Sequence, residues 1–289
     1  MLVMFGTSVP DALPDLMAVR ARVAGRFPGI PVRMAFSSGV IRRIWRERSV
    51  DQAYRNAHPE VEEAVYEVQG VAGTVAELRE EGISDFVLQP VLVAPMETVP
   101  SPAILLGEPE VKMRDCRFVV GRPALGAFDS PHSYRSDVEM AARAVRCDVE
   151  RAFHENCALY YLGHGSGSLL SDRVYGELLA MMEKLHPEVP VVMSLVEGAM
   201  TPDHAIGRLR EFGVGRVLLK PYMIAAGNHV RREMCGPGSG TLQALLESAG
   251  FTVVPVPRGL GENEQFCDIF ADNASDAARQ AGIRLTNEE

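Results

Sequence analysis

Two segments of the chain resemble each other: "LREEGISDFVLQP" at residues 78–90 and "LREFGVGRVLLKP" at residues 209–221. They align without gaps and share Leu, Arg, Glu, Gly, Leu and Pro at matching positions. Each has the pattern of a polar helix end, a glycine turn and a short apolar strand. The likeness indicates that one structural unit is present twice.

Two further matches occur in the same order along the chain. "PVRMAFSSG" (31–39) aligns with "PVVMSLVEG" (190–198), and "LVMFGTS" (2–8) aligns with "LYYLGHG" (159–165). A chance likeness between two strand–helix–strand units is the alternative to a duplicated domain, which we favour. The Pro- and Gly-containing segment 122–132 suits a linker. We therefore expect an N-terminal domain over 1–127 and a C-terminal domain over 128–289, with the last helix able to pack back on the first domain.

Short apolar runs alternate with segments of helical periodicity over the whole length. This alternation predicts an α/β fold with two similar doubly wound parallel sheets. The expected strands are 2–5, 31–36, 85–91, 117–121, 158–162, 190–195, 216–222 and 252–256. The expected helices include 70–81, 133–156, 171–185, 202–212, 240–249 and 263–281.

The composition of the 289 residues is that of a globular protein, with 47% hydrophobic and 23% charged residues. A net charge of −9 argues against general nucleic-acid binding, which requires a basic face. The start of the chain lacks the features of a signal peptide, and the longest apolar stretch (86–96) is too short to cross a membrane. Five cysteines without a C-x-x-C pair suit a reducing compartment, so we expect a cytoplasmic protein.

The repeat also shows where the two halves differ. His164 takes the place of Thr7 after the first strand of each half, and Glu197 takes the place of Ser38 after the second. His229, in "AAGNH", follows the strand that ends in the shared proline. Ligands of open parallel sheets bind at the carboxyl ends of the strands, where these three residues are expected.

Two imidazoles and a carboxylate form a common ligand set for a first-row divalent metal, so His164, Glu197 and His229 are candidate metal ligands. Nitrogen and oxygen donors of this kind suit cobalt, iron, nickel or zinc better than calcium or magnesium. Each residue also has an ordinary alternative: a turn histidine, or an acid at a helix start. Matching edge positions favour the metal site.

The segment "GVIRRIWRERSV" (39–50) is strongly basic for an acidic protein. Arg42 and Arg46 share a helix face, and Arg43 and Arg48 flank them. Guanidinium groups bind carboxylates bidentately, so Arg42, Arg43 and Arg46 are candidates for binding a polycarboxylate ligand. A solvated helix face is an equal alternative. Trp45 in the same segment is expected to pack in the core rather than stack on a ligand.

Several catalytic and nucleotide-binding motifs are absent. "GHGSGS" lacks the serine of a G-x-S-x-G elbow, so Ser166 is a poor candidate nucleophile. There is no P-loop and no G-x-G-x-x-G followed by an acid, so we expect no nucleotide cofactor.

The segments "FGTS", "FSSGVIRRI", "LGHGS", "VEG", "KPYMIAAGNH" and "GLGEN" together resemble the anaerobic sirohydrochlorin cobaltochelatases, which belong to the class II tetrapyrrole chelatases. The resemblance implies two α/β domains with a tetrapyrrole between them and no nucleotide requirement. It matches His164 and His229 to the active-site histidines and Glu197 to a metal-binding glutamate. Glu97 in "APMET" is the acid nearest to a further catalytic position, one residue out of register.

The resemblance implies insertion of Co²⁺ into sirohydrochlorin or a related polycarboxylate tetrapyrrole, with Fe²⁺ and Ni²⁺ as other metals that the donors accept. Removing two pyrrole protons suits imidazole bases near neutral pH. A non-catalytic tetrapyrrole or metal carrier is the rival hypothesis, and a structural protein with incidental histidines is a third. The sequence leaves the formation of a homo-oligomer open.

Overall fold

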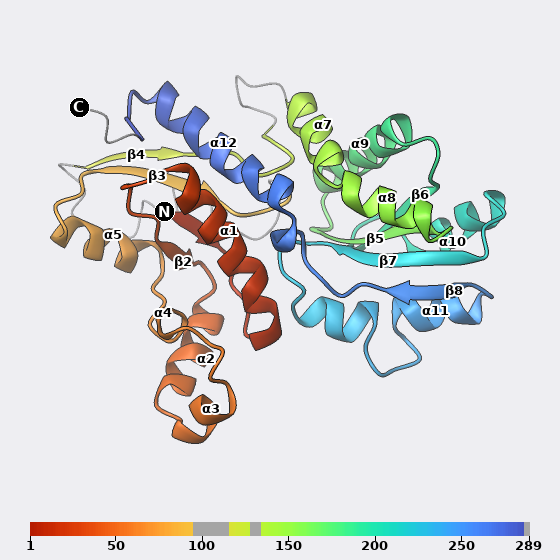
Figure 1. The fold of residues 1–289 in the computed structure, drawn as a ribbon, viewed down its shortest axis with the longest axis horizontal. Helices are drawn as coiled ribbons and strands as arrows, with labels where there is room; N and C mark the ends of the chain where they lie inside the picture. Colours follow the sequence, from red (N-terminus) through yellow and green to blue (C-terminus); the bar gives the residue numbers. More distant parts are fainter. Residues whose placement is uncertain (95–115, 128–133, 286–289) are drawn as a thin grey trace.

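The computed structural model describes residues 1–94, 116–127 and 134–285. It contains two four-stranded parallel sheets, as predicted (Figure 1). The first has the order β2-β1-β3-β4 and the second the order β6-β5-β7-β8, so the strands of each half are arranged in the same permutation. The strands are β1 (Leu2–Met4), β2 (Met34–Phe36), β3 (Asp85–Pro90), β4 (Arg117–Val120), β5 (Ala158–Gly165), β6 (Val191–Glu197), β7 (Arg216–Tyr222) and β8 (Thr252–Pro255).

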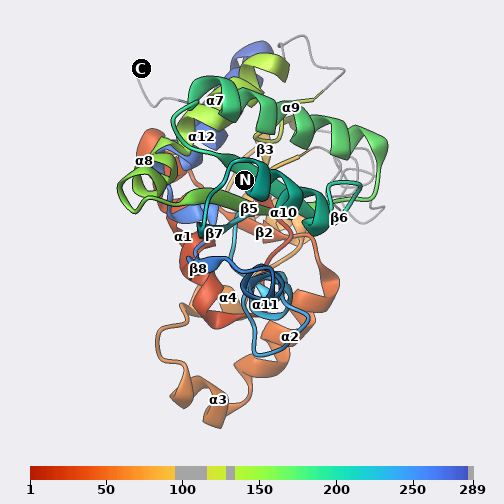
Figure 2. The ribbon, with the colours of Figure 1, turned by 90° about the vertical axis from the view of Figure 1, so that its right-hand side faces the viewer.

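Helices connect the strands of each half. The first half contains η1 (Pro10–Ala12), α1 (Leu13–Arg26), α2 (Gly39–Ser49), α3 (Gln52–Ala57), α4 (Glu63–Tyr66) and α5 (Val71–Glu80). The second half contains α7 (Tyr134–Ala144), α8 (Arg146–His154), α9 (Leu169–Leu185), α10 (Pro202–Glu211), η2 (Val230–Met234), α11 (Leu242–Ser248), η3 (Leu260–Glu262) and α12 (Glu264–Gln280). Figures 1 and 2 show α7 on one side of the second sheet and α11 on the other.

Both faces of each sheet are buried, which is why the strands are nearly continuous apolar runs. Leu2 belongs to one buried cluster and Val3, its neighbour in β1, to another. In β5, Leu159 and Tyr160 divide in the same way between two clusters. The cluster of Leu2 also contains Leu159, so one continuous core joins the inner faces of the two sheets.

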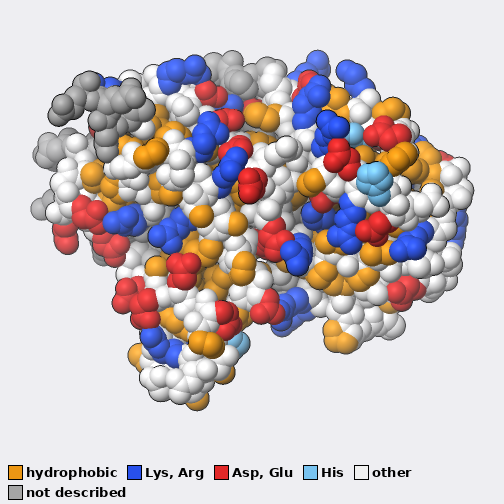
Figure 3. Space-filling model, viewed as in Figure 1, with side chains coloured by type: hydrophobic (Ala, Val, Ile, Leu, Met, Phe, Trp, Pro, Cys, Tyr) orange, Lys and Arg blue, Asp and Glu red, His pale blue; other side chains and the backbone are white. Residues whose placement is uncertain are grey.

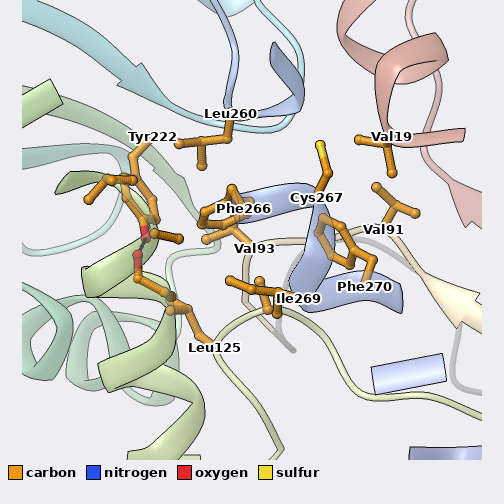
Figure 4. Close-up of a cluster of buried hydrophobic side chains, with 14 of the residues drawn as sticks. Val19, Val91, Val93, Leu125, Tyr222, Leu260, Phe266, Cys267, Ile269 and Phe270 are labelled. Atoms are coloured by element: carbon orange, nitrogen blue, oxygen red, sulfur yellow. Dashed lines mark hydrogen bonds between the residues drawn. The ribbon is translucent and has the colours of Figure 1, made fainter. Parts of the chain in front are cut away.

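The last helix, α12, packs against α1 of the first half. Arg22 of α1 donates to both carboxylate oxygens of Asp268, each at 2.7 Å, and Arg26 donates to Asp272 at 2.9 Å. Figure 4 shows the apolar side of this contact, where Val19 of α1 and Phe270 of α12 belong to one buried cluster. Helix α12 therefore packs against the half that contains α1, while a domain boundary at 127/128 stays a prediction.

One predicted helical stretch is interrupted. We expected helical structure over 133–156, and the structure has two helices there, α7 ending at Ala144 and α8 beginning at Arg146. The amide of Asn263 donates to the carbonyl oxygen of Ala144 at 2.7 Å, so a residue distant in sequence is hydrogen-bonded to the backbone at the break. This contact cannot be read from local periodicity.

Trp45 is fully buried and its indole N–H donates to the carbonyl oxygen of Thr7 at 2.8 Å, which confirms the packing role. All five cysteines are free. Among the described residues, no helix has the length and apolarity that a membrane crossing requires. Side chains of both charges are interspersed over the face shown in Figure 3.

Candidate metal site at the edge of the second sheet

Two imidazoles meet at the carboxyl end of the second sheet. His164 lies near the end of β5, and His229 follows the turn after β7, the neighbour of β5. Their ring centres are 4.8 Å apart and their planes are nearly perpendicular, at 87°. A cation bound about 2.1 Å from an imidazole nitrogen lies about 3 Å from the ring centre. The two ring centres, 4.8 Å apart, are therefore close enough for both imidazoles to bind one cation.

The glycine that follows His164 is required by the backbone. Gly165 has φ +71°, and a Cβ there would lie 1.9 Å from the carbonyl oxygen of Glu197 on the adjacent strand. Only glycine allows this left-handed conformation and close approach together. Gly165 thus allows β5 to lie close to β6 at its end, where His164 is half-buried at the sheet edge.

The hydrogen bonds of the two rings define their tautomers. His164 Nδ1 lies 2.7 Å from the carbonyl oxygen of Gly165, and His229 Nδ1 lies 2.8 Å from a carboxylate oxygen of Glu233. Both partners are acceptors, so each Nδ1 carries a proton. In the neutral form of each imidazole, Nε2 then has a lone pair, which can bind a metal or accept a proton.

Glu233, which contacts His229, is a residue of this candidate site that was not predicted from the sequence. It lies four residues after His229, in the π-helical turn η2 (Val230–Met234), and π-turns are frequent at functional sites. A carboxylate four residues from a histidine on one helical face is a recognisable spacing, so the sequence contained the signal.

Glu197 is not brought to the histidine pair in the same way. It pairs in register with Gly165, whereas His164 is one residue earlier in β5. Paired residues share a face and successive residues alternate, so this register assigns Glu197 and His164 to opposite faces. Among residues 1–94, 116–127 and 134–285, no group of three or more His, Cys, Asp or Glu could hold a metal ion. Glu197 as a third ligand stays a prediction, and Glu97 lies outside the described residues.

The three predicted arginines on α2 are not equivalent. The guanidinium of Arg42 donates to the carbonyl oxygens of Phe36 and Ser37, at the end of β2, and is thus bound to the protein's own backbone. Arg43 is exposed and lies 3.9 Å from Glu47 of the same helix. Arg46 is exposed. The structure does not gather the three heads into one carboxylate clamp.

Comparison with known proteins identifies the family. The model of the family described as "Cobalt chelatase (CbiK)" matches residues 1–279. The chain belongs to this family. It is 26% identical over 280 residues to the sirohydrochlorin cobaltochelatase CbiKC of Nitratidesulfovibrio vulgaris, covering 96% of this chain and 89% of that protein. It is 24% identical over 282 residues to the sirohydrochlorin cobaltochelatase of Salmonella typhimurium, covering 97% and 96% of the two chains.

Solved structures agree with the fold. The sirohydrochlorin chelatase SirB from Bacillus subtilis subspecies spizizenii, in complex with cobalt, superposes with a TM-score of 0.54 at 12% identity, covering 97% of this chain and 95% of that one. CbiX, the terminal enzyme of siroheme biosynthesis in denitrifying bacteria, gives a TM-score of 0.51 at 17% identity, covering 96% and 97%. At these identities the likeness supports the chelatase-like architecture alone.

Proposed function

We propose that this chain is a chelatase that inserts Co²⁺ into sirohydrochlorin. The observation that carries the proposal is the pair of imidazoles, His164 and His229, 4.8 Å apart with both Nδ1 atoms hydrogen-bonded to acceptors. The names of the two cobaltochelatase relatives supply the metal and the tetrapyrrole.

The two imidazoles suit both tasks of metal insertion. Metallation replaces two pyrrole N–H protons by one divalent cation, so the site must deliver the cation and accept protons. A lone pair on Nε2 of His164 or His229 can bind the incoming cation, and it can accept a pyrrole proton after the cation has left. Glu197, at the same edge of the sheet but on the opposite face from His164, is proposed to offset part of the charge of the cation at longer range. The donor set accepts Fe²⁺ and Ni²⁺ as well, so these are the metals to compare with Co²⁺.

The exposed arginines of α2 are proposed to bind carboxylates of the macrocycle. Arg46 is exposed to solvent, and Arg43 forms an exposed ion pair with Glu47. Exchanging these contacts for a substrate carboxylate costs little free energy, because exposed ion pairs contribute little stability. Arg42 is excluded from this role in our proposal, since its head is bound to backbone carbonyls.

An anaerobic absorbance assay with sirohydrochlorin and Co²⁺, then Fe²⁺ and Ni²⁺, tests the proposal. We expect wild-type protein to accelerate metallation and the His164→Ala and His229→Ala variants to lose that acceleration. His204→Ala is the matched control, because His204 is an exposed residue in the first turn of α10. A wild-type protein that binds the tetrapyrrole or Co²⁺ without accelerating metallation would support the carrier hypothesis instead.

A further inference from the structure

A buried aspartate of the first half holds the loop that presents His229 of the second half. Asp15 lies in the first turn of α1 and is 3% exposed. Its Oδ2 accepts the backbone N–H of Ala226 at 2.7 Å, across the junction of the two halves. Ala226 lies in the short connection between β7 and His229. Asp15 therefore contacts the segment that sets the position of one of the two imidazoles.

The "GLGEN" segment (259–263) also packs against Asp15. The N–H groups of Leu260 and Gly261 donate to the carbonyl oxygens of Met223 and Ile224 at 2.8 and 2.9 Å, which ties this segment to the end of β7. A Cβ on Gly261 would lie 2.2 Å from the carbonyl oxygen of Asp15. The glycines of this motif are thus required for the close packing of α1 against the loop.

Gly259 packs closely against the side-chain carboxylate of Asp15. A Cβ on Gly259 would lie 2.6 Å from Asp15 Oδ2 and 2.3 Å from the carbonyl oxygen of Ile224. Burial raises the pKa of Asp15 to about 6, while the backbone N–H groups of Ala226 and Gly259 act in the opposite direction by stabilising the charged form. Burying a carboxylate lowers the stability of the folded protein unless the carboxylate is hydrogen-bonded. Breaking the hydrogen bond from the Ala226 N–H to Asp15 is therefore unfavourable, which holds the loop against α1.

The repeat contains a counterpart that supports this interpretation. With Thr7 aligned on His164, Asp15 aligns on Asp172 in the first turn of α9. Asp172 accepts the backbone N–H of Ala199 at 3.0 Å, in the loop after β6 of its own half. The same repeat position therefore anchors an edge loop in both halves, but only Asp15 anchors a loop of the opposite half.

We propose that Asp15 is a positioning residue for His229, fixing the loop 223–229 against the first half so that the two imidazoles stay within reach of one cation. The inference rests on the proposed function for its role in metal insertion, but the anchoring itself does not. It predicts that loss of the Asp15 carboxylate loosens the His229 loop and weakens metal binding without removing either imidazole.

The test uses Asp15→Ala, Asp15→Asn and a control, Asp272→Asn. The control removes an exposed ion pair between α1 and α12, so it weakens a contact between the halves without touching the loop. Three quantities are measured under anaerobic conditions: hydrogen exchange of the backbone amides of residues 223–229, Co²⁺ affinity without tetrapyrrole, and the rate of Co²⁺ insertion.

We expect Asp15→Ala to speed amide exchange in 223–229 and to weaken Co²⁺ binding roughly tenfold, the lower end of the effect of losing a residue that supports a metal ligand, because Asp15 acts on His229 only through the loop. Asp15→Asn should lie between Ala and wild type, because its Oδ1 can still accept from the Ala226 N–H. Asp272→Asn should match wild type. Unchanged exchange in Asp15→Ala, or Co²⁺ affinity within twofold of wild type, overturns the inference.

The outcomes separate this inference from the proposed function. A wild-type protein that binds Co²⁺ but does not metallate sirohydrochlorin refutes the proposed function, while exchange and Co²⁺ affinity still decide the role of Asp15. If Asp15→Ala does not fold, the comparison of Asp15→Asn with Asp272→Asn carries the decision.

Discussion

Removal of the Glu233 carboxylate should weaken metal binding at His229 without removing any proposed ligand. Glu233 Oε1 lies 2.8 Å from His229 Nδ1, and the two side chains are 46% and 40% exposed. A hydrogen bond to a charged group contributes about 1.5–3 kcal/mol, and partial exposure favours the lower end. About 1.5 kcal/mol corresponds to roughly a tenfold change in an equilibrium constant. We therefore expect Glu233→Ala to weaken Co²⁺ binding about tenfold and to lower kcat/KM for insertion by a similar factor.

The assay is an anaerobic Co²⁺ titration followed by initial rates of insertion. Glu233→Gln should lose less than Glu233→Ala, because the amide oxygen of glutamine can still accept from Nδ1–H. Glu247→Ala is the matched control, since Glu247 is an exposed glutamate that accepts from Gln243 four residues away on α11. If Glu233→Ala and Glu247→Ala give the same Co²⁺ affinity, then Glu233 does not orient His229 and the tautomer argument fails.

Three further predictions concern stability and substrate binding. Lys220→Met should cost about 3–5 kcal/mol in the free energy of unfolding, because the buried Asp148 keeps the Tyr161 hydroxyl but loses its cationic partner at 2.5 Å; the Lys220→Met, Asp148→Asn double variant should recover most of the loss in urea unfolding. The pKa of Asp15 is raised from 3.8 to about 6, so the folded state binds this proton more tightly than the unfolded state does. The stability that this proton binding contributes is present below about pH 4 and is lost as pH rises from about 4 to just above 6, by up to about 3 kcal/mol; urea unfolding of Asp15→Asn from pH 4 to 7 should lack that component, and a slope equal to that of wild type would contradict the assignment. Arg42→Ala should lower the free energy of unfolding by about 2 kcal/mol. Arg46→Ala should leave it within about 0.5 kcal/mol of wild type and raise KM for sirohydrochlorin. The reverse pattern would show that Arg42, and not Arg46, binds the substrate.

Most of the fold could be predicted because the chain repeats its own signals. The paired segments 78–90 and 209–221 indicate equivalent strands, and these strands, β3 and β7, occupy the same place in their sheets. The break between α7 and α8 could not be predicted, because it involves the contact of Asn263 with Ala144. Local periodicity contains no information on such long-range hydrogen bonds.

The positions of the two histidines in the candidate site could also be predicted from the sequence. Strand ends place His164 and His229 at one edge, and adjacency of β5 and β7 brings the rings together. Whether Glu197 shares their face depends on the register of β5 and β6, which a one-residue shift reverses. The internal binding of Arg42 likewise depends on where two carbonyl groups point, and helix periodicity cannot supply that.

A crystal structure of the protein soaked anaerobically with Co²⁺, with anomalous data at the cobalt absorption edge, tests the central claim most directly. We expect one strong peak about 2.1 Å from Nε2 of both His164 and His229, with Nδ1 of His229 still bonded to Glu233. A cobalt peak elsewhere, or bound through only one of the two imidazoles, would contradict the claim that this pair forms the metal site.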